Sequence, residues 1–355
     1  MHIFYTSSYD ASIYLQQPEQ NAGRDEILEV GKLYYGSTMD VARTLIKFNV
    51  SNLETGSGWK AYLNLKSANS EEIPLEYTIY ANAISQSWTM GTGTKFDNIT
   101  SDGVSWYYKN GTNKWMDYVA IPNSYVSGSD TGSISNGGGG TWYTASMASQ
   151  SFSNEPDDIR MDVTNIVNLW ISSSLGNNGF IIHHHTSASV DSNDYGVLKF
   201  FSKETDTIYQ PKLEIVWNDT SINTGSLAPT TGSAQDGYKV VLTNLKNKYI
   251  KDSKIKIRIK GRDMYPLKSF SNTFEYDQTK YLPSTTYYQL EDYVTSEVIY
   301  PFGIYTQLSC DSTSNYFNMN LNTLPANRTY KLKIKIVEGG ISTIIDDKLI
   351  FEIVE

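Results

Sequence analysis

Alternation of apolar and polar residues predicts several β-strands along the chain. Ala61–Leu65 and Tyr77–Tyr80 alternate with a period of two, and Lys254–Lys260 and Lys331–Ile336 do so more strictly. Successive side chains of a strand point to opposite faces, so each segment should place one face on a core and the other on solvent. In the two C-terminal segments the polar face is basic. The pattern indicates sandwich strands in both halves of the chain.

A short helix followed by closing strands is predicted between residues 162 and 217. Ile166, Val167 and Trp170 recur at helical spacing and therefore share one face. Gly179 then suits a turn, and two apolar segments lead to an alternating strand that ends at Trp217. A domain should therefore close near residue 218.

The composition changes after this point. Residues 219–235 are rich in Thr, Ser and Gly and poor in apolar residues, which is typical of a connector. We therefore predict a first domain over 1–218, a linker over 219–235 and a second domain over 236–355. The second domain has a size typical of immunoglobulin-like sandwiches, about 120 residues. The predicted fold class is all-β.

A series of short motifs in the first domain carries a family resemblance. In chain order they are Asp10–Tyr14, Asn21–Gly23, Leu28–Val30, Arg43–Val50, Trp88–Thr89, Val104–Trp106, Asp162–Thr164, Asn178–Phe180, Phe201–Ser202 and Pro211–Ile215. Together they resemble the DNRLRE family, whose β-sandwich domains are similar to carbohydrate-binding modules of the alginate-binding type. The resemblance implies a jelly-roll-like sandwich in which Trp88 and Trp106 occupy packing positions.

A second set of motifs lies in the C-terminal domain. It comprises Arg262–Pro266, Tyr287–Asp292, Pro301–Phe302, Leu308–Asp311 and Asn315–Phe317. This set resembles a recurrent domain in structural proteins of large tailed bacteriophages. The resemblance implies a virion component that acts through contacts with other virion proteins, on the capsid, the neck or the tail.

Charge and cysteine content limit the classes of partner. The formal net charge is −9, which argues against a nucleic-acid partner, since phosphate contacts need clustered Lys and Arg. The single cysteine, Cys310, cannot form an internal disulfide. The sequence also contains 27 tyrosines and 7 tryptophans, residue types enriched at subunit interfaces. We therefore expect a homo-oligomer.

The sequence also bears on location and on catalysis. It has no run of about 18 apolar residues, so no membrane span is expected. The N-terminus carries no basic and apolar leader, so we expect synthesis in the host cytoplasm and a final location in the virion. A nucleophile elbow, a phosphate-binding loop and a His-Glu-x-x-His helix are all missing from the sequence. A non-enzymatic protein is predicted.

Tryptophans in loops are the candidates for glycan binding. Residues 84–150 hold four tryptophans among Gly, Ser, Asn and Thr. Trp115 and Trp142 lie in the most irregular settings and could stack on sugar rings of a host-surface glycan, while the amides of Asn110 and Asn113 bond hydroxyl groups. Burial of these rings in a subunit interface is an equally open reading. The alternative function is a carbohydrate-binding module of a polysaccharide-recognising or polysaccharide-degrading system.

Carboxylates and histidines give two candidate metal sites. Asp191 and Asp194 are oxygen ligands of the kind that Ca²⁺ prefers, but the sequence around them lacks the pattern of a defined calcium loop. Ordinary turn chemistry explains them equally well. In the triplet His183–His185 neighbouring side chains would alternate between faces of a strand, so a structural or surface role is favoured. We expect no obligatory cofactor and leave a Ca²⁺ site at Asp191 and Asp194 open.

Overall fold

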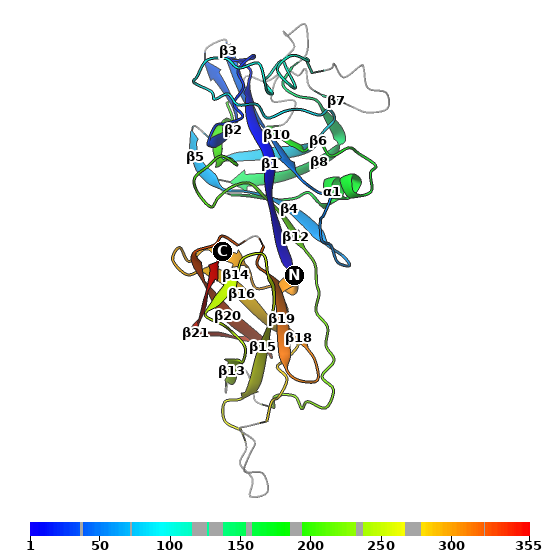
Figure 1. Ribbon diagram of the computed structural model, residues 1–355, viewed down its shortest axis with the longest axis vertical. Coiled ribbons are helices and arrows are strands. Elements are labelled where there is room, and N and C mark those ends of the chain that lie inside the picture. Colours follow the sequence, from blue (N-terminus) through cyan, green and yellow to red (C-terminus); the bar gives the residue numbers. More distant parts are fainter. Residues whose placement is uncertain are drawn as a thin grey trace, which may run out of the picture. The chain divides into compact units, whose positions relative to one another are not determined.

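The computed structural model confirms the all-β fold class. It describes residues 1–35, 38–71, 73–115, 126–127, 138–153, 158–184, 194–231, 237–266, 278–322 and 324–355. Its strands form antiparallel sheets almost throughout (Figure 1). Among these residues the structure has one α-helix, α1 (Thr164–Ile171). None of the described helices is long and apolar enough to cross a membrane.

The chain divides into two compact units that do not follow a single boundary. Unit 1 comprises Met1–Phe4, Glu54–Trp59 and Ile215–Glu355, and unit 2 comprises Tyr5–Leu53 and Lys60–Glu214. The chain passes from unit 2 to unit 1 for the last time between Glu214 and Ile215, close to the predicted boundary at residue 218. Residues 1–4 and 54–59 differ from the prediction. They were assigned to the first domain, but they belong to the same unit as residues 215–355.

Unit 2 is built on one extended network of strands. Its strands are β1 (His2–Tyr14, which begins in unit 1), β2 (Ile27–Tyr35), β3 (Thr38–Phe48), β4 (Lys60–Leu65), β5 (Ser67–Glu71), β6 (Glu76–Ile84), β7 (Val126–Ser127), β8 (Trp142–Ser153), β9 (Ile159–Asp162), β10 (Phe180–His184), β11 (Gly196–Phe201) and β12 (Lys212–Val216). The order is β7-β8-β6-β10-β3-β1-β12-β4-β9, and β2 pairs with both β3 and β11, which also pairs with β5.

Strand β3 organises this network because it pairs with three other strands. Its Leu45 lies opposite Ala11 of β1 and Ile181 of β10, and its N-terminal half pairs with β2. The sequence suits a strand that is covered on both faces, since Leu45 and Ile46 are both fully buried. The antiparallel layers therefore have a β-sandwich-like character.

Helix α1 buries the predicted face. Ile166, Val167 and Trp170 are all buried, and the Trp170 ring lies 4.6 Å from that of Phe180 on β10. The backbone N–H of Thr164 donates to the carboxylate of Asp162, 3.0 Å away, which satisfies a donor of the first helical turn. The prediction of an amphipathic helix is confirmed.

Unit 1 consists of two sheets around a separate core. Its elements are β13 (Tyr238–Leu242), β14 (Lys248–Ile250), β15 (Lys254–Asp263), β16 (Thr286–Asp292), β17 (Val298–Tyr300), the 3₁₀ turn η4 (Ile304–Thr306), β18 (Ser309–Cys310), β19 (Asn315–Asn320), β20 (Arg328–Glu338) and β21 (Ile341–Val354). The sheets have the orders β13-β15-β19-β18 and β14-β21-β20-β16-β17, and only the β14–β21 pair among those described in this unit is parallel.

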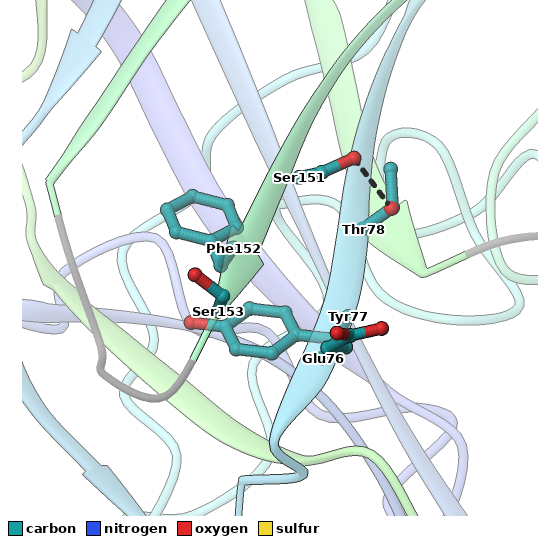
Figure 2. Close-up of a pocket in the computed structure, with 6 residues that line it drawn as sticks. All are labelled: Glu76, Tyr77, Thr78, Ser151, Phe152 and Ser153. Atoms are coloured by element: carbon teal, nitrogen blue, oxygen red, sulfur yellow. Dashed lines mark hydrogen bonds between the residues drawn. The ribbon is translucent and has the colours of Figure 1, made fainter.

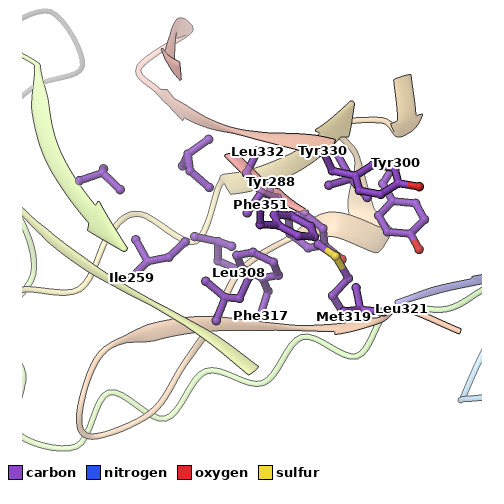
Figure 3. Close-up of a cluster of buried hydrophobic side chains, with 14 of the residues drawn as sticks. Ile259, Tyr288, Tyr300, Leu308, Phe317, Met319, Leu321, Tyr330, Leu332 and Phe351 are labelled. Carbon is purple, nitrogen blue, oxygen red and sulfur yellow. The ribbon is translucent and has the colours of Figure 1, made fainter. Parts of the chain in front are cut away.

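The core of unit 1 is aromatic and aliphatic. Figure 3 shows Tyr288 and Phe317 at its centre, with ring centroids 4.1 Å apart and planes nearly parallel. The strict alternation predicted for β15 and β20 is confirmed, because Ile257, Ile259 and Ile334 are fully buried.

The basic faces of the same two strands are matched by carboxylates. Lys256 and Arg258 of β15 both bind Asp311, at 3.1 and 2.9 Å. On β20, Lys331 and Lys333 bind Asp346 and Glu291. These pairs offset part of the positive charge on the basic faces of β15 and β20.

The described part of the predicted linker is bonded to unit 1. Ile222 and Pro229 form bridges with Cys310 and Tyr281. The N–H and hydroxyl groups of Thr231 donate to the buried Asp263 carboxylate at 2.9 and 3.0 Å. Residues 219–231 are therefore part of the folded unit. The low apolar content that suggested a linker reflects pairing through backbone and polar groups.

The first residues of the chain complete the core of unit 1. The Phe4 side chain belongs to its buried cluster and lies 5.9 Å from the Tyr300 ring, while His2 stacks on the same ring at 4.9 Å. The backbone N–H of Trp217 donates to the Met1 carbonyl. A core contribution thus comes from residues more than 200 positions away in sequence.

Replacing Phe4 by Ala should destabilise unit 1 by about 3 kcal/mol, because a buried aromatic side chain is removed from a packed core. Cys310 is buried in this unit and is the sole cysteine of the sequence, so the rate at which its thiol reacts with a disulfide reagent reports opening of unit 1. Thr6→Ala, at an exposed position of the same strand, is the matched control. Equal labelling rates in Phe4→Ala and in the unaltered protein would contradict the packing role.

Candidate functional site

The predicted sugar platforms are packing residues. Trp115 is 3% exposed and Trp142 is 1% exposed, and both belong to one buried cluster with Trp88 and Trp106. The indole N–H of Trp115 donates to the Ser105 carbonyl at 3.1 Å. The prediction that Trp115 and Trp142 present flat faces to a glycan is therefore wrong, because their faces are covered by the protein itself.

One of these covering groups is a buried arginine. The Arg43 guanidinium lies 4.8 Å from the ring centroid of Trp106 and 5.0 Å from that of Trp142. Its Nη1 donates to the Gly139 carbonyl at 2.7 Å. Gly139 has φ +76°, and a Cβ there would lie 2.4 Å from Arg43 Nη1, so the close approach requires glycine. The aromatic faces are thus used for cation–π packing inside unit 2.

The predicted amide ligands belong to a turn. The side-chain oxygen of Asn110 accepts a hydrogen bond from the backbone N–H of Asn113 at 2.9 Å, and the Asn113 carbonyl accepts one from Lys109. Asn113 is exposed, but the nearby Trp115 ring is buried and offers no stacking surface. Sugar binding by this group of four residues has no geometric support.

The described residues show no cluster that would hold a metal ion. They contain no group of three or more His, Cys, Asp or Glu side chains in ligand geometry. Asp194 accepts a hydrogen bond from the backbone N–H of Tyr34 at 2.5 Å, whereas Asp191 and His185 lie outside the described residues. The Asp194 contact is the turn chemistry that competed with a Ca²⁺ role in the sequence.

The other two histidines are buried on opposite faces of β10. His183 Nε2 lies 3.0 Å from the Asn82 side-chain oxygen, and its ring packs 4.8 Å from Trp142. Within the described structure neither ring nitrogen of His184 has a hydrogen-bond partner. Burial lowers the pKa of His184 to about 3, which keeps the ring neutral. Both histidines therefore have the structural role that the sequence favoured.

A buried asparagine fixes part of the segment that follows β6. Asn21 is fully buried, and its Nδ2 donates to the carbonyls of Met90 and Val104, both at 2.7 Å. Its Oδ1 accepts the Gly93 N–H at 2.8 Å. A Cβ at Gly103 would lie 2.3 Å from the Asn21 amide, so glycine permits this approach. The single side chain therefore positions part of residues 85–115, in which the structure has no helix or strand.

The wall formed by this segment borders a groove of about 550 Å³ in unit 2. Its lining comes from β1, the connection between β1 and β2, β3, the segment after β6 and the turn after β11, and comprises Ser8, Tyr9, Arg24, Lys47, Trp88, Thr89, Met90, Gly91, Thr92, Lys203 and Glu204. Tyr9 is 46% exposed and lies opposite Lys47 in the β1–β3 pairing. The groove therefore offers an accessible aromatic ring.

Packing beneath the Tyr9 ring holds it in place. The ring meets Trp88 edge to face, with centroids 6.3 Å apart. Trp88 is itself 6% exposed and donates its indole N–H to the Asn178 carbonyl at 2.8 Å. The buried Trp88 therefore supports the Tyr9 ring, and the Tyr9 ring is the one that a ligand can reach.

The groove is cationic in a protein of net negative charge. Arg24, Lys47 and Lys203 line it together with one carboxylate, Glu204. Glu204 bridges two of the cations, at 3.6 Å from Arg24 and 3.1 Å from Lys203. A local excess of positive charge attracts anions.

A second, shallower hollow lies between the ends of β6 and β8. Figure 2 shows its lining, Glu76 to Thr78 and Ser151 to Ser153, around a volume of about 400 Å³. Tyr77 and Phe152 stack on each other at 4.9 Å, and the hydroxyls of Thr78 and Ser151 lie 2.9 Å apart. The rings of Tyr77 and Phe152 thus contact each other, and the hydroxyls of Thr78 and Ser151 bond to each other. The groove at Tyr9 is therefore the better candidate site.

Comparison with known proteins gives no family. No protein-family model matches the chain, and no curated protein matches it. The groove and the resemblances in the sequence are the features of the chain that bear on function.

The sequence contained a signal for the groove that the prediction missed. Tyr9 directly precedes the motif at Asp10, and Lys47 lies within the motif Arg43–Val50. Tyr9 and Lys47 lie opposite each other in the β1–β3 pairing, and alternation places them on the same face as the buried Ala11 and Leu45. The positions of Tyr9 and Lys47 in the sequence do not show that Arg24 and Lys203, which are far apart in the chain, line the same groove.

Replacing Asn21 by Ala should destabilise unit 2 by about 3 kcal/mol or more, because two buried carbonyls and one buried N–H lose their partners. Urea unfolding followed by tryptophan fluorescence measures the effect, since Trp88, Trp106 and Trp115 lie in the segment or cluster that Asn21 supports. Asn98→Ala is the matched control, because Asn98 is an exposed amide of the same segment. If the two variants unfold at the same urea concentration, the hydrogen bonds of Asn21 do not hold this segment in place.

Proposed function

We propose that this protein is a non-enzymatic structural protein of a tailed-bacteriophage virion whose unit 2 binds an anionic saccharide of the host surface. The observation that carries the binding role is the groove, in which the exposed ring of Tyr9 lies among Arg24, Lys47 and Lys203. The alternative, a carbohydrate-binding module of a polysaccharide-degrading system, would use the same groove.

The residue types of the groove fit this ligand class. The apolar face of a pyranose packs on an aromatic ring, and carboxylate groups pair with ammonium and guanidinium groups. One ring and a few partly exposed cations leave only a few kcal/mol after the costs of binding, so the affinity of one groove should correspond to a Kd of about 1 mM. Firm attachment then depends on several copies that bind together.

The carboxylate content of the groove supports binding over hydrolysis. Glycoside hydrolysis by the common mechanisms uses two carboxyl groups that flank the scissile bond. The lining of this groove contributes Glu204, which is engaged by Arg24 and Lys203.

Exposed apolar residues on an ordered loop support assembly through protein contacts. Phe96 is 87% exposed and Ile99 is 62% exposed. The loop that carries them is held by Gln20, whose amide donates to the Thr94 carbonyl, and by Asp25, which accepts the Lys95 N–H at 3.1 Å. Large apolar side chains that are fixed in place and open to solvent are typical of interaction surfaces. The C-terminal resemblance favours other virion proteins and further copies of this chain as the partners.

Binding of tetragalacturonate should depend on the groove. Tyr9→Ala should weaken binding roughly fivefold by removing the platform, and Lys47→Glu should weaken it roughly tenfold by reversing a charge. Isothermal titration calorimetry at low salt measures both, and added salt should weaken binding of the unaltered protein.

Two controls separate the site from general charge effects. Methyl-esterified tetragalacturonate has the same backbone without carboxylates and should bind less tightly. Lys114→Glu changes an exposed lysine that does not line the groove and should bind like the unaltered protein. Binding that Tyr9→Ala and Lys47→Glu leave unchanged would show that the saccharide does not use this groove.

Self-association should depend on the exposed loop. The double variant Phe96→Ser/Ile99→Ser should shift the sedimentation coefficient towards the monomer, because it removes exposed apolar area from the contact. Leu75→Ser is the control, since Leu75 is 74% exposed elsewhere in unit 2. A protein that is monomeric at all concentrations and in the presence of its virion partners would refute assembly through this loop.

A further inference from the structure

A buried carboxyl joins two of the segments that line the groove. Asp10 is 1% exposed and follows Tyr9 on β1. Its Oδ2 accepts hydrogen bonds from the backbone N–H of Lys203 at 2.7 Å and from the Ser7 hydroxyl at 3.3 Å. Tyr9 and Lys203 both line the groove, whereas Asp10 does not. The Asp10 carboxyl therefore ties the strand that presents the ring to the turn that presents a cation.

The surroundings of Asp10 contain few compensating charges. Two charged side chains with a marked effect on its carboxyl are Lys203, which attracts it, and Glu204, which repels it. These two side chains bind each other at 3.1 Å, so their effects partly cancel. From β3 the residue opposite Asp10 is the uncharged Ile46. The negative charge of an ionised Asp10 is thus largely unbalanced.

Burial has a direct consequence for ionisation. It raises the pKa of Asp10 to about 7, against the lowering effect of the hydrogen bonds from Lys203 and Ser7. The carboxyl therefore exchanges its proton within the ordinary range of environmental pH. A neighbouring anion would favour the protonated form further.

We propose that Asp10 is a proton-sensitive positioning residue of the groove, and that its protonation strengthens the binding of an anionic saccharide. The inference rests on the proposed function for its ligand. By linkage, a ligand that binds the protonated form more tightly takes up protons on binding, so affinity falls as pH rises through neutrality. For a ligand carboxylate about 10 Å from Asp10 at an effective dielectric constant of about 40, the loss is roughly fourfold.

The first experiment needs no ligand. Nuclear magnetic resonance of selectively labelled protein follows the Asp10 carboxyl carbon and the Lys203 backbone amide between pH 4 and pH 9. We expect both signals to titrate together near pH 7. A carboxyl that titrates near pH 4, or a Lys203 amide that does not follow it, would overturn the proposal. Unfolding free energy provides a second readout: as pH rises from about 4 to about 7, that of the unaltered protein should fall relative to that of Asp10→Asn, because the opposite contribution of His184 is common to both proteins.

The second experiment measures tetragalacturonate affinity at pH 5.5, 7.0 and 8.5. The unaltered protein should lose roughly fourfold in affinity over this range. Asp10→Asn keeps an oxygen that can accept the Lys203 N–H but carries no charge, so it should bind equally well at every pH. Asp102→Asn is the matched control. Hydrogen bonds from Thr92, a groove residue, lower the pKa of Asp102, so it stays ionised over this range, and its variant should retain the pH dependence.

The outcomes distinguish the two proposals. Identical pH profiles for the unaltered protein and Asp10→Asn would refute the role of Asp10 while leaving the groove as a binding site. If tetragalacturonate binds at no pH, the proposed saccharide class is wrong, and the ligand-free titration then decides whether Asp10 couples protonation to the groove segments.

Discussion

The structure of unit 2 depends on buried polar groups that hold irregular backbone against a sheet. The amide of Asn21 satisfies Met90, Gly93 and Val104, and the guanidinium of Arg43 lies between Trp106 and Trp142. A loop cannot be buried unless its backbone groups find partners. These two side chains supply partners and packing, so the segment after β6 can form a rigid wall of the groove.

This constraint explains why the aromatic residues divide into two roles. Tryptophans close to the buried polar groups are covered and contribute packing energy. Tyr9 shares its face of β1 with the buried Ala11 and Ile13, but its ring packs on the edge of Trp88 and is 46% exposed. An aromatic residue in a glycine-rich stretch is therefore not exposed by default, because glycine also allows close approach and burial.

Charged side chains also have two roles, one in unit 1 and another in the groove of unit 2. In unit 1 part of the positive charge on the basic faces of β15 and β20 is offset by Asp311, Asp346 and Glu291. The groove of unit 2 is lined by three cations and one carboxylate, Glu204, which binds Arg24 and Lys203, and the buried Asp10 accepts the Lys203 N–H. The groove therefore carries a local excess of positive charge, although the net charge of the whole chain is −9.

The sequence alone determined the all-β class, the alternating strands of both units and the buried face of α1, because these depend on local periodicity and on residue size. It also favoured structural roles for His183 and His184. Only the tertiary structure decided that Trp115 and Trp142 are buried, that Phe4 belongs to the core of unit 1 and that Tyr9, Lys47 and Lys203 share a groove. Each of these depends on contacts between residues far apart in the chain, and periodicity carries no information about which distant segments meet.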